Sequence, residues 1–450
     1  MLHRSRTLAL VLALVSLLAL AACGGDDDGG GGGGDKADAG GGPVELTFLT
    51  HWAPETVEKL EAVAADYKEQ NPDVTVKVRA VPFADLLTTL RSQAGSDDGP
   101  TLSSIYDLWL PELVRDGVVA EAPSDAASAI KEGWPENLAG AASVEGKPYG
   151  FPNEVNLYAL NYNKRLLEEA GFDAPPKSWD EMMSMAEKLT KRDGKRITQQ
   201  GLGFISSWAA GTVHPFASLL NSNGGTLIED GKAKLDSEQA KQTFQLVEDA
   251  FKNKKVASPQ MATADANTTG PYLDNFVSGK TAMLIMANWW ESALKTGMKG
   301  KFKDVGTAPI PVGPSGSGPA PVSYSWLTVV NAKADEAEQQ AAWKFLSWLN
   351  SPESGEEGHS AMAALLQSMG ILPSRTSDLE AYQKDLDRPF LEGYVSQLEN
   401  AKPFPVVVGG QEFTEGLQKT IEALQAGQLS ADEAQKRAQE DAQSVLESAG

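Results

Sequence analysis

The sequence has very few of the side chains on which most enzyme and metal sites depend. Of its 450 residues, one is cysteine, Cys23, and four are histidine. His51, His214 and His359 do not pair at the spacing of metal ligands on a helix, and no His-Glu-x-x-His, Gly-x-Ser-x-Gly or Cys-x-x-Cys motif occurs. We therefore expect no metal, no cofactor and no thiol or disulfide chemistry in the folded body.

Positive charge is also scarce. The chain has 39 lysine and arginine residues against 61 aspartate and glutamate residues, which gives a formal net charge of −22. A surface this acidic repels nucleic acid and anionic lipid, so we expect no nucleic-acid partner.

Long apolar runs are absent except at the N-terminus. The basic residues His3, Arg4 and Arg6 precede the apolar run 8–20 and two alanines, which is the layout of a secretory signal peptide over residues 1–22. Leu20-Ala21-Ala22-Cys23 resembles the lipobox of bacterial lipoproteins. We expect Cys23 to be lipidated and to anchor the chain to the extracytoplasmic face of the bacterial cell membrane. The alternative is a secreted protein with a chance cysteine.

Residues 23–43 lack the side chains needed for a core. Glycine and aspartate dominate this segment, which predicts a solvated linker. Twenty such residues span roughly 25 Å, enough to let a folded body move above the membrane.

The body shows the periodicities of an α/β fold. Residues 44–50 (VELTFLT) and 74–81 (VTVKVRAV) alternate as strands do, and a helix is expected between Thr56 and Asn71. Ser-x-x-Glu capping boxes at 178–181 and 430–433 predict two further helix starts. Roughly 400 residues exceed one core and indicate two lobes. The proline-rich segment 306–321 is expected to cross between them.

Many aromatic residues stand in loops or at strand ends beside polar groups. The segments THWAP, YDLW, ISSWAAGTVHPF, MANWWES and SYSWL have this character. By contrast, Trp343 and Trp348 have helical spacing and are expected in the core, and Trp134 lies in a surface-like segment. Sugars complement such loops, because their C–H faces pack on aromatic rings and their hydroxyls both donate and accept hydrogen bonds. Packing between lobes is the alternative role of these aromatic residues.

The chain resembles the extracellular solute-binding proteins of the maltose-binding-protein class, the receptors of ABC importers. The resemblance covers nearly all of residues 44–450. It is carried by the segments YGFPNEVNLYALNYNKRLLEEAGFDAPPKSWDEMMSMAEKLT, FVSGKTAMLIMANWW, KFLSWLNSPESG and GILPSR. It implies two α/β lobes, a hinge of crossing strands and a ligand cleft between the lobes. The implied N-terminal lobe comprises residues 44–152 and 322–372, and the C-terminal lobe comprises residues 153–321 and 373–450.

The resemblance also implies site residues. Trp289 falls where members place a stacking aromatic ring, His214 near a position that is often aromatic, and Asn156 where many members have a carboxylate. The complete expected ligand-binding set is His51, Trp52, Asp107, Trp109, Glu154, Asn156, Trp208, His214, Trp289, Trp290, Tyr324 and Trp326. Tyr324 and Trp326 flank the expected crossover, so hinge packing is their alternative role.

We expect a monomeric receptor that closes on a mono- or oligosaccharide and delivers it to a membrane permease. Two alternatives stay open. A cationic solute such as a polyamine would suit the acidic body. A surface glycoside hydrolase could use Asp107 and Glu154 as paired carboxylates, although with 61 acidic residues such pairs arise by chance.

Overall fold

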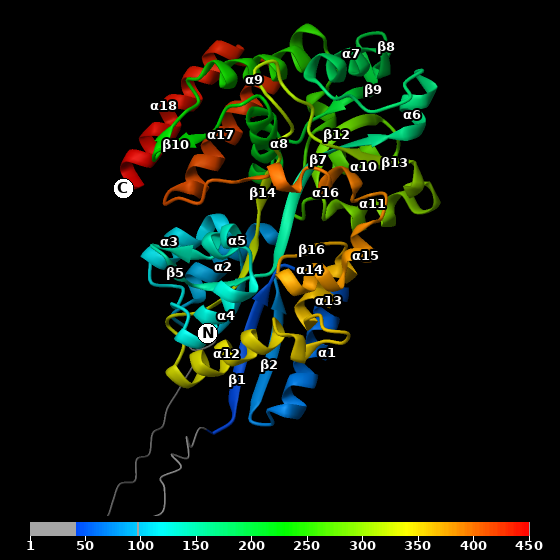
Figure 1. Ribbon diagram of the computed structural model, residues 1–450. Coiled ribbons are helices and arrows are strands. Elements are labelled where there is room, and N and C mark those ends of the chain that lie inside the picture. Colours follow the sequence, from blue (N-terminus) through cyan, green and yellow to red (C-terminus); the bar gives the residue numbers. More distant parts are fainter. Residues whose placement is uncertain (1–41, 97–98, 450) are drawn as a thin grey trace, which may run out of the picture. The chain divides into compact units, whose positions relative to one another are not determined.

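The computed structural model describes residues 42–96 and 99–449, and these contain two α/β lobes, each built on its own sheet (Figure 1). The expected signal peptide, Cys23 and most of the expected linker lie outside the described residues. Within them, none of the helices has the length and hydropathy of a membrane span.

The first sheet has five strands in the order β2-β1-β3-β15-β6. Its strands are β1 (Val44–Thr50), β2 (Val74–Ala80), β3 (Leu102–Tyr106), β6 (Gly150–Pro152) and β15 (Trp326–Val330). β1 runs parallel to β2 and β3, whereas β15 is antiparallel to β3 and β6. The helices that follow and surround these strands are α1 (Pro54–Gln70), α2 (Phe83–Gln93), α3 (Leu110–Arg115), α4 (Ser124–Gly133), α5 (Glu136–Ala141), α12 (Glu336–Leu349), α13 (Ala361–Met369) and α14 (Thr376–Ala381).

The second sheet is larger and is centred on the long strand β7 (Glu154–Asn163). Its order is β17-β14-β7-β12-β9-β8, and β13 and β16 also pair with β7. Its other strands are β8 (Lys191–Asp193), β9 (Arg196–Gly203), β12 (Thr281–Ala287), β13 (Val305–Ala308), β14 (Val322–Tyr324), β16 (Leu372–Pro373) and β17 (Lys402–Pro403). The helices of this half are α6 (Lys164–Glu169), α7 (Trp179–Leu189), α8 (Ala209–Ser222), α9 (Glu238–Glu248), α10 (Pro271–Val277), α11 (Trp290–Met298), α15 (Gln383–Leu386), α16 (Glu392–Val395), α17 (Gly410–Gln425) and α18 (Ala431–Ala449). Two short hairpins, β4 (Ser143–Val144) with β5 (Lys147–Pro148) and β10 (Ile228–Glu229) with β11 (Lys232–Ala233), complete the strands.

Local sequence rules explain several of these elements. β1 and β2 lie where alternation predicts strands, and α1 ends before Asn71-Pro72, although it begins at Pro54 rather than Thr56. At Ser430, the hydroxyl accepts from the Glu433 amide, and the Ser430 amide donates to the Glu433 carboxylate, so the predicted capping box is confirmed. The box at Ser178 is half formed, because Glu181 accepts from the Lys177 amide instead of the Ser178 amide.

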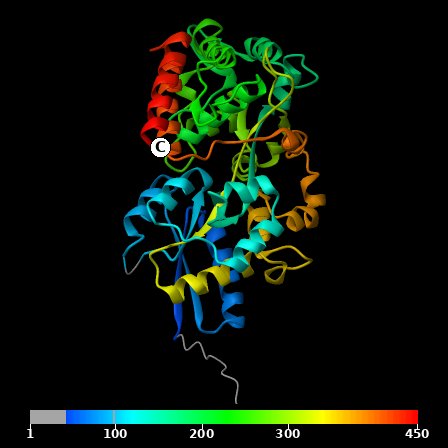
Figure 2. The same ribbon diagram turned by 60° about the vertical axis from the view of Figure 1, so that its left-hand side comes forward.

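The proline-rich segment does not form the crossing between the two sheets that the sequence predicts. Residues 309–321 do not cross between the lobes but lie against α8, where the Ala320 and Val322 amides donate to Ser222 and Ser218. The crossing follows at Ser325, between β14 in the second sheet and β15 in the first (Figure 2). The proline-rich composition therefore marks a loop that leads to the hinge, and the lobe boundaries given above remain a prediction.

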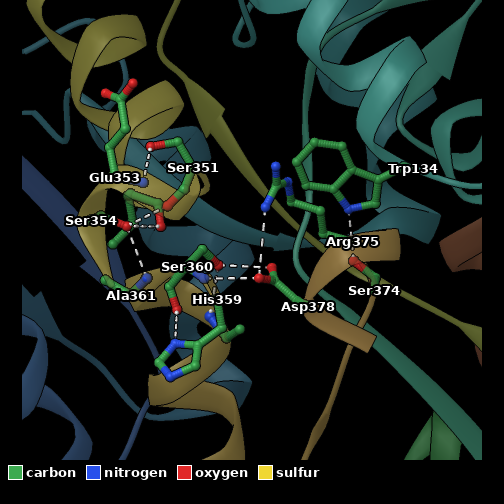
Figure 3. Close-up of polar contacts among 12 residues, drawn as sticks. Trp134, Ser351, Glu353, Ser354, His359, Ser360, Ala361, Ser374, Arg375 and Asp378 are labelled. Carbon is green, nitrogen blue, oxygen red and sulfur yellow. Dashed lines mark hydrogen bonds and ion pairs between the residues drawn. The ribbon is translucent and has the colours of Figure 1, made fainter. Parts of the chain in front are cut away.

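A buried polar cluster joins α13, α14 and the segment between them to Trp134 and β6 (Figure 3). The Asp378 carboxylate accepts from the amide and the hydroxyl of Ser360, both at 2.8 Å, and thereby ties α14 to the start of α13. Trp134 is 5% exposed and donates through Nε1 to Ser374 Oγ at 2.9 Å, which in turn donates to the Pro152 carbonyl. The expectation that Trp134 lies at the surface is wrong, because its indole anchors the segment after β16.

Candidate ligand-binding cleft

A cavity of about 390 Å³ lies where the two sheets meet, and eight of its 22 lining residues carry aromatic rings. The rings come from the end of β1, the start of α2, the end of β3, the loop before α8, the turn after β12 and the crossing at β14–β15. They are His51, Trp52, Phe83, Tyr106, Trp208, Trp289, Tyr324 and Trp326. The carboxyl ends of the parallel strands β1, β2 and β3 supply one side, which is where α/β sheets commonly bind ligands.

Contacts among these rings hold them in place. His51 stacks on Trp326 with ring centroids 4.0 Å apart, and Trp208 meets Trp289 edge to face at 5.8 Å. Trp289 also donates from Nε1 to the Tyr324 hydroxyl at 2.7 Å, which ties the turn after β12 to the end of β14, next to the crossing. The aromatic wall is therefore largely preformed.

Three polar atoms in this wall are buried and without a hydrogen-bond partner within residues 42–96 and 99–449. They are His51 Nδ1, Glu154 Oε2 and Trp208 Nε1. Burial raises the pKa of Glu154 to about 8, with a further rise from Asp107, and the nearby Asn156 amide opposes the rise in part. Burial lowers the pKa of His51 to about 4. At neutral pH both side chains are mainly uncharged and can donate as well as accept hydrogen bonds.

Asp107 does not line the cavity but braces the hinge. Its two carboxylate oxygens accept from the Ser325 amide at 2.7 Å and from the Leu108 amide at 2.8 Å. Burial raises the pKa of Asp107 to about 7, an effect that these two backbone hydrogen bonds oppose. The side chain therefore ties the end of β3 to the crossing between β14 and β15.

His214 and Asn156 are both fully buried behind the cavity wall. His214 Nε2 shares a hydrogen bond of 2.7 Å with the Tyr106 hydroxyl, and burial lowers the pKa of His214 to about 3. The neutral imidazole thus supports a ring that lines the cavity, while Asn156 lies in β7 opposite Tyr324 of β14.

The two adjacent tryptophans after β12 have different surroundings. Trp289 is partly exposed and lines the cavity. Trp290 is fully buried in the core of the second lobe, where its ring lies 4.9 Å from Phe276 and 6.0 Å from Tyr272.

A second cavity of about 740 Å³ continues from the first, and Phe83, Tyr106, Trp208, Ala210 and Thr268 line both. Its wall is richer in polar and charged side chains, among them Arg91, Glu112, Asp265 and Glu412. Trp109 belongs to this second cavity and donates from Nε1 to Gln411 Oε1 at 2.9 Å. Together the two cavities form one cleft, which we call the ligand cleft.

Sequence reasoning missed several lining residues. Phe83 follows β2 just as His51 follows β1, so the rule of strand ends could have identified it. Tyr106 lies in the quoted YDLW segment, in which only Asp107 and Trp109 were expected at the site. Lys59 and residues 267–269 carry no signal in the sequence, because their helix and loop reach the cavity only through tertiary packing.

Histidine, cysteine and carboxylate side chains are the groups that would hold a metal ion. In the part of the chain that the structure describes, no three or more His, Cys, Asp or Glu side chains are grouped so that they could hold a metal ion.

Comparison with known proteins agrees with this architecture. A protein of Brucella abortus described as a binding protein is 26% identical over 417 residues, which cover 91% of this chain and 95% of that protein. The diacetylchitobiose-binding protein of Streptomyces coelicolor is 26% identical over 384 residues, covering 82% of this chain and 81% of that protein. The solved structure of the GacH receptor of Streptomyces glaucescens superposes with a TM-score of 0.76 at 22% identity, covering 90% of this chain and 99% of that one.

This structural likeness establishes the two-lobed binding-protein fold. The sequence model of the bacterial extracellular solute-binding proteins matches residues 53–356. This range includes the lining residues Trp208, Trp289 and Trp326. The chain belongs to this family of extracellular solute-binding proteins.

Proposed function

We propose that the chain is the receptor of an ABC importer, and that it captures a mono- or oligosaccharide in the ligand cleft and delivers it to a membrane permease. The observation that carries this proposal is a preformed wall of aromatic rings into which buried, uncharged hydrogen-bonding groups are set.

This combination matches the surface of a sugar better than that of other small solutes. The apolar face of a pyranose ring packs on an indole ring, such as that of the partly exposed Trp289 in the cavity wall. Hydroxyl groups both donate and accept, so they can pair with a donor such as Trp208 Nε1 and with a carboxyl group such as that of Glu154, which are otherwise buried without a partner.

The relatives support the same ligand class. The relative from Streptomyces coelicolor is named for binding diacetylchitobiose, and the GacH receptor was solved in complex with acarbose. The ligand of this chain need not be either of these compounds, since the identities are only 26% and 22%.

Binding rings are supplied by both lobes and by the crossing strands. His51 and Tyr106 belong to the first lobe, whereas Trp208 and Trp289 belong to the second. A sugar that contacts both lobes stabilises the closed state by its differential affinity for that state, and the closed form is then presented to the permease.

A hydrolytic role is less well supported by the geometry. Both carboxylate oxygens of Asp107 accept hydrogen bonds from backbone amides, and the side chain does not line the cleft. Asp107 therefore cannot act with Glu154 as a pair of carboxyl groups on either side of a glycosidic bond. We infer that the protein binds its solute and leaves it chemically unchanged.

A cationic ligand is also disfavoured. The aromatic cavity is lined by Glu55, Glu154 and Lys59, and Glu154 is largely protonated at neutral pH. Over the whole ligand cleft, four basic side chains face five acidic ones besides Glu154, which leaves little net negative charge to attract a polyamine.

We further propose that residues 1–22 are removed as a signal peptide and that a lipidated Cys23 holds a monomer at the membrane. Mass spectrometry of the processed N-terminus, with Cys23→Ser as the control, tests this part. A chain that begins at Cys23 with acyl groups supports it, and an unmodified thiol refutes it.

The binding proposal is tested with the mature chain and a panel of mono- and oligosaccharides. A bound sugar raises the melting temperature, because it binds only the folded chain. Calorimetry then gives the affinity, and chromatography of the recovered sugar shows whether any bond was broken. Saturable binding with the sugar unchanged is expected, whereas product formation, or failure of every sugar to bind, refutes the proposal.

A further inference from the structure

The second lobe has a basic hollow that shares no lining residue with the ligand cleft. Its volume is about 470 Å³, and it lies between the β8–β9 hairpin and the turn of π-helix η2 (Asp249–Asn253) with the residues that follow it. Figure 1 shows β8 and β9 beside α7, at the end of the second lobe remote from β1. Arg192, Lys195, Arg196 and Lys255 line the hollow, together with Phe251 and Met261.

The charge of this hollow is unusual for the chain. Four basic side chains line it and no acidic one does, although acids outnumber bases by 61 to 39 in the sequence. Asp193 is exposed on the same hairpin but is not part of the lining. Within the residues that the structure describes, none of the four basic groups forms a salt bridge, whereas neighbouring Lys252 and Lys254 pair with Glu248 and Glu187. The unpaired charges therefore converge where nothing in the lining compensates them.

Backbone geometry holds these groups in position. The Arg192 guanidinium donates to the Lys255 carbonyl, which links the hairpin to the segment after η2. Lys255 itself has a left-handed backbone with φ of 54°, and the Lys254 amide donates to the Asp249 carbonyl at 2.8 Å. Gly194, with φ of 57°, forms the tight turn that sets Lys195 and Arg196 at the rim.

The chemistry of the wall selects a phosphate group. A guanidinium offers parallel donors that match phosphate oxygens, and lysines add compact positive charge around them. The hollow is far larger than a phosphate ion, and Phe251 and Met261 provide apolar surface for an organic body attached to it. We propose that this basic hollow binds a phosphate group carried by a larger molecule, separately from solute capture in the ligand cleft.

The experiment uses the mature chain with Cys23→Ser, which carries no lipid anchor that would itself bind vesicles. The three probes are inorganic phosphate and glycerol 3-phosphate, followed by ³¹P NMR, and vesicles of phosphatidylglycerol with phosphatidylcholine, followed by co-sedimentation. The test variants are R192Q/R196Q and K195Q/K255Q. K436Q/R437Q on α18 is the control, because it removes the same charge from exposed side chains elsewhere. K195Q/K255Q keeps the Arg192 side chain that ties the hairpin, so it stays informative if R192Q/R196Q fails to fold.

We expect each test pair to bind at least tenfold more weakly than the wild type at low salt, while the control binds as the wild type does. Binding of glycerol 3-phosphate identifies a soluble phosphate ester as sufficient, and binding to vesicles alone identifies a lipid headgroup. The proposal is overturned if the wild type binds none of the three probes, or if the control loses as much binding as K195Q/K255Q. Sugar binding in the ligand cleft is expected to be unchanged in all variants.

Discussion

The neighbouring residues Trp289 and Trp290 allow a strict test, because the structure assigns one side chain to the cavity wall and the other to the core. Trp289 lines the aromatic cavity, and Trp290 is fully buried against Phe276 and Tyr272. Alanine at the first position should therefore weaken sugar binding, and alanine at the second should weaken the fold.

The first substitution should change the free energy of binding, and the second should change the free energy of unfolding. An indole that covers one face of a sugar removes on the order of 80 Å² of apolar surface from water, which corresponds to about 2 kcal/mol of binding free energy. Trp289→Ala should then raise the dissociation constant about 30-fold. Trp290→Ala empties a closely packed site and should lower the free energy of unfolding by about 3–5 kcal/mol.

Trp289→Phe separates the ring from its hydrogen bond. Phenylalanine keeps an aromatic face but loses the donor to the Tyr324 hydroxyl, whose contribution is about 1 kcal/mol. We expect an affinity between those of the wild type and Trp289→Ala.

Calorimetry with the best sugar of the panel and urea unfolding measure the two quantities on all three variants. The reasoning is refuted if Trp289→Ala binds as tightly as the wild type. It is equally refuted if Trp290→Ala unfolds at the wild-type urea midpoint.

Substitutions at three further positions test the buried polar groups, and urea unfolding measures the stability of each variant. Glu154→Gln removes a carboxyl group whose pKa burial raises from 4.5 to about 8, so the wild type loses stability as pH rises through that window, because only the unfolded chain releases the proton. The variant should lose less stability between these pH values, and parallel pH profiles would contradict the assigned burial. Tyr106→Phe leaves His214 Nε2 without its hydrogen-bond partner and should lower the free energy of unfolding by about 1–3 kcal/mol. An unchanged urea midpoint would show that this bond does not stabilise the fold. Asp107→Ala leaves the Ser325 and Leu108 amides without an acceptor and should lower the free energy of unfolding by about 2–5 kcal/mol. Asp107→Asn keeps an acceptor and should lower it less. Equal losses of stability in the two variants would exclude the hinge role.

The sequence predicted the parts of the fold that local patterns encode. Alternation places β1 and β2, and the reciprocal bonds of Ser430 and Glu433 start α18 as the capping rule requires. The burial of Trp134 could not be predicted from local patterns. Its indole is buried and donates to Ser374, which is 240 residues away in the chain.

The candidate site was predictable only as a set of loops. A loop that follows a strand identifies His51 and Trp52 as neighbours of a cleft, and both line the cavity. It does not determine which way a side chain points within a turn, so Trp289 and Trp290 look alike in the sequence. Polar residues near the hinge, such as Asp107 and His214, suggest ligand contact equally well, although their hydrogen bonds are to the hinge and to Tyr106.

X-ray scattering from the mature chain, with and without a saturating sugar from the panel, tests most directly whether the solute is held between the two lobes. We predict a smaller radius of gyration in the presence of the sugar, reached at the same concentration at which calorimetry shows saturation. A sugar that binds to saturation while the scattering curve stays that of an open, unliganded chain would contradict capture by closure of the lobes.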